Sequence, residues 1–347
     1  MKNIRLFESV QQEDTSVKEP TYVSYNEQTG LVTCVKPMDG GDEDLLYKGR
    51  TITCTIRLND QEDYFSSPVD LSNPVILCMT PTISEILGFD LNEVGATGIG
   101  LDVEKIIFHD ADVQPRVLEY EGTKIDGLYF FDKYGTYTYT IVLKEKPKHL
   151  NAAFSFSAFY ESPDTTLMRV DVSNLDTSDV EEAILMFNHS FMLNEVVGIE
   201  NLIQGKCVNV SGLFVACYSL ESINFGGWDV SNVKNMSAML TSCFVGFNEG
   251  SEGFESYYKN YTLDFTNWDI SKVTIMDEAF ICGANVIKMG GNPSSLESCG
   301  YIVLEDIDGE FWYNDEYDYS KIIAALPENW NAVACVMRNG ELVPILA

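Results

Sequence analysis

INFGGWDVSNVKNMSAML, from Ile223 to Leu240, is one copy of a repeat, because the same pattern returns from Leu263 to Phe280 as LDFTNWDISKVTIMDEAF. An earlier copy, VDVSNLDTSDVEEAILMF, runs from Val170 to Phe187, and a more divergent copy, VGIENLIQGKCVNVSGLF, runs from Val197 to Phe214. A short unit of this kind cannot bury its own apolar edge. The repetition therefore predicts a stack of similar units that cover one another.

The apolar residues of the four copies fall into columns. Two apolar residues two positions apart begin each copy, as Ile223 and Phe225 do, and predict a very short strand with one buried face. Further apolar residues follow at i, i+3, i+6 and i+7, which predicts a helical segment of about two turns. The predicted repeat core comprises Val170, Val172, Val180, Phe187, Ile223, Phe225, Val233, Met236, Met239, Leu263, Phe265, Val273, Met276 and Phe280.

The spacing of the copies predicts the type of repeat. The copies begin at Val170, Val197, Ile223 and Leu263, so the steps between them are 27, 26 and 40 residues. The first two steps fall within the period of leucine-rich repeats, about 20–29 residues. The third step contains an acidic, glycine-rich insertion from Gly246 to Tyr261. We expect this insertion to form a surface loop.

Two copies carry a more specific pattern. WDVSNVKNMSAML begins at Trp228, WDISKVTIMDEAF begins at Trp268, and Cys217-Tyr-Ser-Leu-Glu precedes the first of them. These segments resemble the BspA-type leucine-rich repeats of bacterial surface proteins, whose units read close to WDxSxVxxMxxMF with a following C-x-x-L. The resemblance covers roughly residues 167–290 and is partial in the first copy, which has Leu175 in place of Trp. It implies a protein-binding or adhesive solenoid without catalysis.

Two polar or aromatic columns of the repeat permit a structural and a functional interpretation. Trp228 and Trp268 share one column, which is typical of ladder packing and can also form a contact ridge for a ligand. Serine recurs in another column, two residues after an aspartate. We expect these side chains to satisfy N–H groups at the start of the following helical segment. The pairs are Asp176 with Ser178, Asp229 with Ser231, and Asp269 with Ser271.

Residues 45–160 alternate as strands do. Short runs separated by Gly, Pro, Asn and Asp predict an antiparallel sandwich with only two helical turns, at Thr82–Leu87 and Leu91–Val94. The segment Phe130–Leu143, FFDKYGTYTYTIVL, resembles the closing strands of immunoglobulin-like PKD modules. Phe154–Tyr160, FSFSAFY, predicts a further strand that leads into the repeats. The candidate strands of the sandwich are Thr51–Leu58, Val75–Met79, Lys105–Phe108, Val117–Tyr120, Leu128–Phe131 and Thr136–Leu143.

The N-terminal residues 1–44 predict an arm with a hairpin. Tyr22–Tyr25 and Leu31–Val35 alternate around an N-E-Q-T-G turn. The segment Pro20–Gly30, PTYVSYNEQTG, is similar to one found near the N-termini of many virion proteins of tailed bacteriophages that infect gut bacteria. The alternative interpretation of this segment is an ordinary surface hairpin with no link to virion proteins.

The C-terminal residues 301–347 are placed to cap the repeats, which need a terminal cap. Ile302–Leu304 predicts a last strand, and Tyr319–Leu326 predicts a short helix. Ala332–Met337 and Leu342–Leu346 predict a hairpin around the Asn-Gly turn at Gly340. The predicted architecture is therefore mainly β: an arm (1–44), an immunoglobulin-like sandwich (45–160), a leucine-rich solenoid of strands and short helices (161–300) and a cap (301–347).

The charge balance limits the class of partner. The chain has 22 Lys+Arg against 53 Asp+Glu, a net charge of −31, which argues against nucleic acid and against an anionic membrane. Such acidity serves solubility, fits a basic partner surface, or binds cations at an assembly interface. No apolar run approaches the ~20 residues needed to span a bilayer. The N-terminus shows no secretory signal pattern, so we expect synthesis and folding in a cytoplasm.

Catalytic patterns are weak in this sequence. The nine cysteines are scattered and contain no C-x-x-C, which favours buried thiols over disulfides or zinc. Two acidic constellations, His109–Asp112 and Asp306–Glu310, have the composition of a metal or carboxylate site, and turn chemistry explains both equally well. No phosphate-binding glycine loop and no G-x-S-x-G occurs. We therefore predict no catalytic, cofactor-binding or metal-binding residues.

These observations favour a non-enzymatic bacteriophage virion structural protein: a capsid decoration, head fibre or tail component. Its solenoid would contact other virion proteins or a host-surface ligand, in a homo-oligomer or a larger assembly without nucleic acid or membrane insertion. A bacterial cell-surface adhesin is the first alternative. The second is a carbohydrate-active enzyme that uses Asp110 or Asp112.

Overall fold

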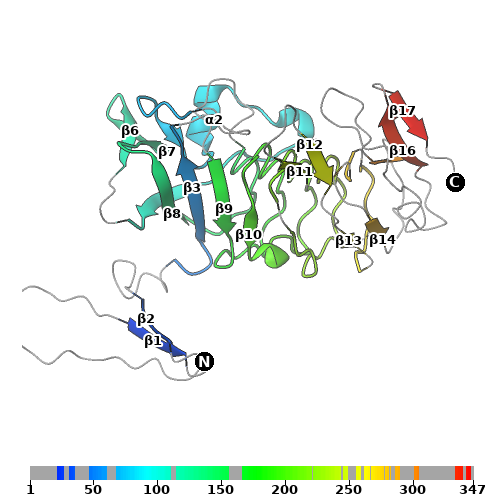
Figure 1. The fold of residues 1–347 in the computed structure, drawn as a ribbon, viewed down its shortest axis with the longest axis horizontal. Helices are drawn as coiled ribbons and strands as arrows, with labels where there is room; N and C mark the ends of the chain where they lie inside the picture. Colours follow the sequence, from blue (N-terminus) through cyan, green and yellow to red (C-terminus); the bar gives the residue numbers. More distant parts are fainter. Residues whose placement is uncertain are drawn as a thin grey trace, which may run out of the picture. The chain divides into compact units, whose positions relative to one another are not determined.

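The structure, a computed structural model, is mainly β (Figure 1). It describes residues 22–26, 31–35, 47–60, 68–110, 115–155, 166–220, 222–243, 245–248, 255–258, 262–265, 267–276, 278–280, 282, 286–289, 301–304, 333–338 and 341–344. The chain divides into two compact units, residues 1–48 and 49–347. The first unit contains the predicted hairpin: β1 (Tyr22–Asn26) pairs antiparallel with β2 (Leu31–Val35).

A five-stranded sheet forms the first part of the second unit. Its order is β10 (Glu195–Val197), β9 (Thr166–Asp171), β3 (Thr51–Leu58), β8 (Gly135–Leu143) and β5 (Val103–Phe108). The alternation of apolar and polar residues in β3 explains why one of its faces lies on the core. Ile52, Cys54 and Ile56 are fully buried, while the threonines between them face outward. The β9–β10 pair is parallel, and the other pairs are antiparallel.

A second, three-stranded sheet supplies the facing apolar layer. Its order is β4 (Val75–Ile76), β7 (Thr123–Phe130) and β6 (Arg116–Tyr120). Phe108 of the first sheet packs edge-on against Tyr129 of the second, with ring centroids 5.2 Å apart. The six strands predicted between Thr51 and Leu143 are all present. The predicted helical turns are also present, as α2 (Pro81–Leu87) and the 3-10 helix η1 (Asn92–Val94).

Helix α2 is short because strong signals bound it on both sides. The Thr80 hydroxyl accepts a hydrogen bond from the Ile83 N–H, and Pro81 occupies the first turn, where no N–H is needed. Gly88 ends the helix with a left-handed φ of 66°, and its N–H donates to the Glu85 carbonyl.

The repeats form a ladder of hydrogen-bonded segments, which we call rungs 1 to 5. They are residues 148–155, 181–190, 208–217, 234–243 and 274–280. A column of parallel bridges joins them, running through His149, Glu182, Asn209, Asn235 and Ile275. Backbone bonds continue each bridge: Ala183, Leu185 and Phe187 donate to the carbonyls of Asn209, Ser211 and Leu213 at 2.9–3.0 Å. Figure 1 shows these segments as successive loops beside β9 and β10.

The rungs are not the helical segments that the i, i+3, i+6, i+7 spacing predicts. The third residue after each bridge has a left-handed backbone, which ends any α-helix at that point. These residues are Ala152 (φ 53°), Leu185 (53°), Gly212 (62°), Ala238 (51°) and Glu278 (55°). The N–H groups then bond between neighbouring rungs instead of within one turn.

Rung 1 also corrects the strand predicted at Phe154–Tyr160. Phe154 lies in a turn whose N–H donates to the Met186 carbonyl at 2.8 Å, while residues 156–160 are outside the described part of the chain. The Phe154, Phe187 and Phe214 rings stack in order, with centroids 5.7 and 5.1 Å apart. Rung 1 is thus an additional repeat segment that follows β8 directly.

The sheets and the rungs share one hydrophobic core, which extends from Ile52 to Cys282. Strand β9 belongs to the first predicted repeat, yet it pairs with β3, so Cys54 lies opposite Val170. The predicted division between residues 45–160 and 161–300 is therefore not a boundary between compact units. Strand β9, which follows that division, belongs to the same sheet as β3, β8 and β5.

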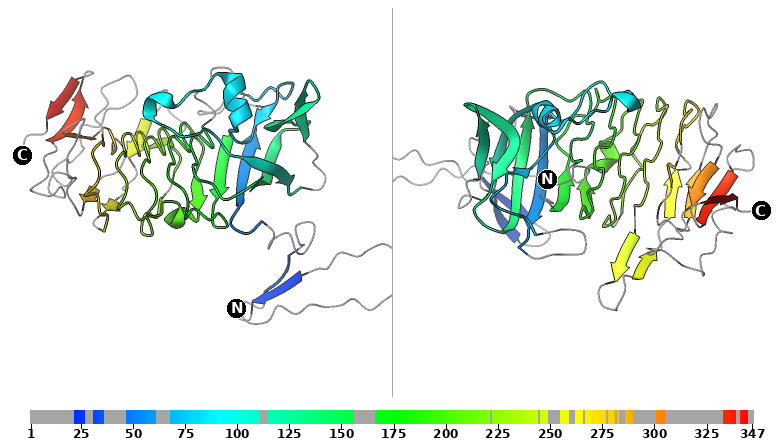
Figure 2. Two further views of the ribbon diagram at one scale, coloured as in Figure 1. Left: turned by 180° about the vertical axis from the view of Figure 1, so that it is seen from behind. Right: turned by 90° about the horizontal axis from the view of Figure 1, so that it is seen from above.

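The insertion and the C-terminal part contain further strand pairs (Figure 2). Strand β11 (Val245–Asn248) pairs antiparallel with β12 (Glu255–Tyr258), so the insertion predicted as a loop includes a hairpin. Strand β13 (Thr262–Phe265) pairs in parallel with β14 (Val286–Met289). The predicted C-terminal hairpin is β16 (Val333–Arg338) with β17 (Glu341–Pro344), and β15 (Tyr301–Leu304) pairs in parallel with β16. The helix predicted at 319–326 lies outside the described residues.

Candidate contact surfaces

Every residue that the sequence assigns to the repeat core is buried. The exposed fractions of these side chains range from 0% at Val170 and Met236 to 7% at Ile223. All belong to the shared hydrophobic core. The columns of the sequence thus correspond to the inside of the ladder.

The tryptophan column does not form a contact ridge. Trp228 and Trp268 are only 6% and 5% exposed, and their indoles stack with centroids 5.7 Å apart and planes 6° apart. Trp228 Nε1 donates to the Ile199 carbonyl at 2.6 Å. The functional interpretation of this column is therefore wrong, because neither ring offers a face to a ligand.

A different aromatic column reaches the surface. Phe191 and Tyr218 occupy the same position, nine residues after the bridges at Glu182 and Asn209. Both side chains are partly exposed, and their rings stack with centroids 5.3 Å apart and planes 15° apart. His189 meets Phe191 edge-on at 5.6 Å. We call His189, Phe191 and Tyr218 the aromatic column. A partly exposed aromatic group of this kind is typical of protein contact sites.

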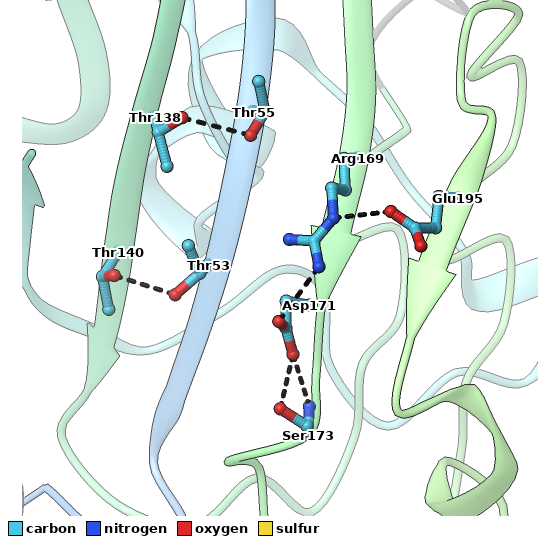
Figure 3. A network of polar contacts seen from close by, with 8 residues as sticks. All are labelled: Thr53, Thr55, Thr138, Thr140, Arg169, Asp171, Ser173 and Glu195. Atoms are coloured by element: carbon cyan, nitrogen blue, oxygen red, sulfur yellow. Dashed lines mark hydrogen bonds and ion pairs between the residues drawn. The ribbon is translucent and has the colours of Figure 1, made fainter. Parts of the chain in front are cut away.

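The outer face of the five-stranded sheet carries polar side chains (Figure 3). Threonine hydroxyls bond across strands, Thr53 to Thr140 at 2.9 Å and Thr55 to Thr138 at 3.2 Å. The next strand continues the row with Arg169, whose Nε donates to Glu195 at 2.6 Å. Such cross-strand pairs fix the strand register. Thr53, Thr55, Thr138 and Arg169 are partly exposed and give this face a polar contact chemistry, whereas Thr140 is buried.

Aspartate turns line one edge of the repeats. Asp176, Asp229 and Asp269 accept from the backbone N–H groups of Ser178, Ser231 and Ser271 at 3.0–3.1 Å. The aspartates therefore satisfy N–H groups as expected, but they do so in turns and not at a helix start. A bond from Lys146, with the Ser178 bonds next, lowers the pKa of Asp176 to about 2.

The segment from Phe89 to Gly100 lies across rungs 1 and 2, and we call it the strap. Leu91 of the strap packs with Ala152 and Ile184 in a small cluster separate from the main core. Glu182, only 6% exposed, accepts hydrogen bonds from the Thr97 N–H at 2.8 Å and from the Thr97 hydroxyl at 2.9 Å. A buried carboxylate with these partners was not evident from the sequence, because Thr97 and Glu182 lie 85 residues apart.

The two acidic constellations lie largely outside the described residues, which include only His109 and Asp110 of them. His109 Nε2 lies 2.8 Å from the Thr140 hydroxyl, and Asp112 and residues 306–310 fall outside the described part. His, Cys, Asp and Glu side chains nowhere gather in threes within the part that the structure describes. The thiols of Cys54, Cys78, Cys207 and Cys217 are buried, and burial raises the pKa of Cys207 to about 12. No helix within the described ranges is long and apolar enough to span a bilayer.

One family model matches the chain. Its description is "Mycoplasma protein of unknown function, DUF285", and it matches residues 155–256. The matched range holds rungs 2 to 4 together with the aromatic column, so the similarity lies in the repeats. No curated protein and no solved structure matches the chain.

Proposed function

We propose that this chain is a non-enzymatic structural protein of a bacteriophage particle, a capsid decoration, head fibre or tail component, and that its repeats bind other proteins. In this proposal the rungs are a short leucine-rich solenoid of the BspA type, and the two facing sheets are an immunoglobulin-like sandwich joined to it. The N-terminal arm is the attachment segment, since its hairpin coincides with the PTYVSYNEQTG stretch that resembles phage virion proteins.

The aromatic column carries the proposal for binding. A rigid ladder repeats one backbone geometry, so residues of one column present similar groups at regular spacing. Phe191 and Tyr218 are the stacked, partly exposed pair in the matched range. The net charge of −31 favours a partner with a basic rim around the apolar contact.

A bacterial surface adhesin is the second candidate. The matching family model is described as a mycoplasma protein, and the resemblance to BspA-type repeats also belongs to bacterial surface proteins. Both candidates use the same repeats for protein contact. They differ in the particle or envelope that holds the chain.

Mass spectrometry separates the two candidates. Gradient-purified phage particles and washed host envelopes from the organism that carries this gene would be compared. We expect peptides of this chain at stoichiometric level in the particles. Peptides found only in the envelope would overturn the virion proposal and support the adhesin.

Two variants test the aromatic column within either setting. Tyr218→Asp should lower the amount of chain incorporated or the affinity for the recovered partner at least tenfold, because it removes an aromatic contact and adds a charge. Lys234→Glu is the matched control, since Lys234 is exposed on rung 4 away from that column. Equal behaviour of the two variants, both still folded by circular dichroism, would remove the column from the binding surface.

A further inference from the structure

The strap is attached to the rungs by a small apolar cluster and by hydrogen bonds. Its buried apolar residue is Leu91, which packs with Ala152 and Ile184 in a cluster separate from the core shared by the sheets and rungs, while its partly buried Ile99 contacts both. The views in Figures 1 and 2 agree that the strap runs along one side of the first rungs. A segment with little apolar burial of its own belongs to the least stable part of a protein.

Polar contacts complete the attachment. Glu182 Oε2 accepts from both the N–H and the hydroxyl of Thr97. It also accepts from Asn151 Nδ2 at 2.8 Å, and the same Asn151 nitrogen donates to the Gly98 carbonyl at 2.9 Å. Three donors therefore converge on one buried oxygen. Charge-assisted bonds of this kind fix the strap to both rungs.

His149 lies between rung 1 and the strap. A Cβ added at Gly98 would meet its Nε2 at 2.4 Å, so the ring and the strap backbone are in close contact. Its Nδ1 is buried and has no hydrogen-bond partner in the part of the chain that the structure describes. A protonated imidazole has two N–H donors, and a buried donor without an acceptor destabilises the state that contains it.

In the part of the chain that the structure describes, rungs 1 and 2 supply charged groups near His149. Glu182 on rung 2 is the charged group that acts on it, and the strap presents the uncharged Thr97 and Gly98. Lys148 and Glu181 are neighbours in the ladder, with exposed side chains. Burial lowers the pKa of His149, and Glu182 acts in the opposite, weaker direction.

We propose that the strap is a latch that acid releases. When the pH falls, His149 takes up a proton in the open state. The strap then leaves rungs 1 and 2 while the sheets remain folded. Opening exposes Ala152, Ile184 and Leu185, whose counterparts on rung 4 are the small residues at 237 and 238. The release thus uncovers an apolar patch on the side of the ladder, and it goes beyond the proposed function.

The direction follows from proton linkage. Because the pKa of His149 is lower in the closed state, the closed state binds fewer protons than the open state. The closed latch keeps its full stability above the ordinary histidine pKa of about 6.5 and loses stability as the pH falls below it. One histidine that protonates only in the open state increases opening up to about tenfold between pH 7.5 and 5.5.

Hydrogen exchange measured by mass spectrometry on the full chain tests the latch. After correction for intrinsic exchange rates, we expect protection of strap peptides to fall several-fold, up to about tenfold, from pH 7.5 to 5.5. Peptides from β3 and β8 should keep their protection. An unchanged strap, or an equal loss in the strap and the sheets, would overturn the proposal.

Matched variants identify the titrating group. His149→Asn should abolish the pH dependence, since asparagine already occupies this column at Asn209 and Asn235. His109→Asn, which changes an exposed histidine of the sheet region, should leave it intact. Gly98→Ala should open the strap even at pH 7.5, because its Cβ meets the His149 ring.

A pH dependence caused by a carboxylate instead of His149 would give a different result in these variants. If Glu182 were the responsible group, Glu182→Gln would remove the pH dependence while His149→Asn retained it, and the proposal would be wrong. We expect Glu182→Gln to weaken the strap at every pH and to keep the fall on acidification. Circular dichroism of each variant establishes that the sheets are folded before exchange is compared.

Discussion

The sheets and the rungs bury apolar side chains with two different kinds of pairing. In β3, each partner is distant and occurs once: Cys54 lies opposite Tyr139 on one side and Val170 on the other. In the rungs, each partner is the same position of the next repeat, as Glu182, Asn209 and Asn235 show. The sheet register depends on alternation within each strand, whereas the ladder register depends on columns shared between repeats.

The shared core makes these two regions one cooperative unit, and a buried charge is the strongest test. Met236→Asp places an unpaired carboxylate at a position that is 0% exposed in rung 4. We expect a loss of more than about 4 kcal/mol in the free energy of unfolding. Thermal unfolding followed by near- and far-ultraviolet circular dichroism should show both regions lost together.

The control is Met236→Leu, which keeps the volume and should cost less than about 1.5 kcal/mol. A Met236→Asp protein whose sheets still unfold at the wild-type temperature would contradict the shared core. The comparison would then be between two independent domains.

One substitution made in both regions measures how their buried thiols differ. In the rungs, the Cys243 thiol donates to the Phe214 carbonyl at 2.8 Å, and Ser190 already makes the equivalent bond to the Phe154 carbonyl at 3.0 Å. Cys243→Ser should therefore cost less than about 1 kcal/mol. Cys78→Ser puts a hydroxyl among the apolar residues between the sheets and should cost about 1–3 kcal/mol. Urea unfolding of both variants gives the difference, and a reversed order would contradict it.

A glycine substitution at a left-handed position of the rungs should increase stability. Ala238 has a φ of 51°, a conformation unfavourable for a residue with a Cβ, and the same column contains Gly212. Ala238→Gly should stabilise the protein by up to about 1 kcal/mol after the entropy of the unfolded chain is included. Ser237→Gly, one residue earlier and without a positive φ, should destabilise it. Thermal midpoints that fall for both would show that the column is not strained.

The smallest expected effect concerns the ion pair of Lys146, which follows β8, with Asp176, which precedes rung 2. The Lys146 bond is the main cause of the low pKa of Asp176, about 2. Ionised Asp176 thus stabilises the fold above its ordinary pKa, and this contribution is lost as the pH falls towards 2. Lys146→Ala should raise the pKa of Asp176 in an NMR titration and leave that of Asp269 unchanged, since Ser271 lowers the latter. Stability at neutral pH should hardly change, because Lys146 is exposed and Asp176 is partly exposed.

The sequence predicted the elements of the sheet region well, because alternation reports directly which face of a strand is buried. Thr51–Leu58 was predicted and found with the same bounds. The same reasoning failed in the rungs. Apolar residues at i, i+3, i+6 and i+7 fit a helix, but a left-handed residue such as Leu185 breaks the helix and keeps the same side chains inside. Only the glycine at 212 hinted at that conformation.

The surface of the ladder was harder to predict than its core. Burial columns are visible in one sequence because apolar residues recur at Val180, Cys207, Val233 and Val273. Whether a column is exposed depends on which other segments of the chain pack over it. The tryptophans at 228 and 268 are covered by their own neighbours, whereas the strap arrives from a segment 85 residues away in sequence at the Thr97–Glu182 contact. Such long-range contacts leave no local pattern.

The hairpin of β11 and β12 enters between rungs 4 and 5 without disturbing their bonds. Asn235 still bridges Ile275 across 40 residues of chain, as Asn209 bridges Asn235 across 26. The pairing of rungs 4 and 5 therefore does not fix the number of residues that connect them. Additional sequence can be inserted there, in evolution or by protein engineering, and the rungs on either side keep their pairing.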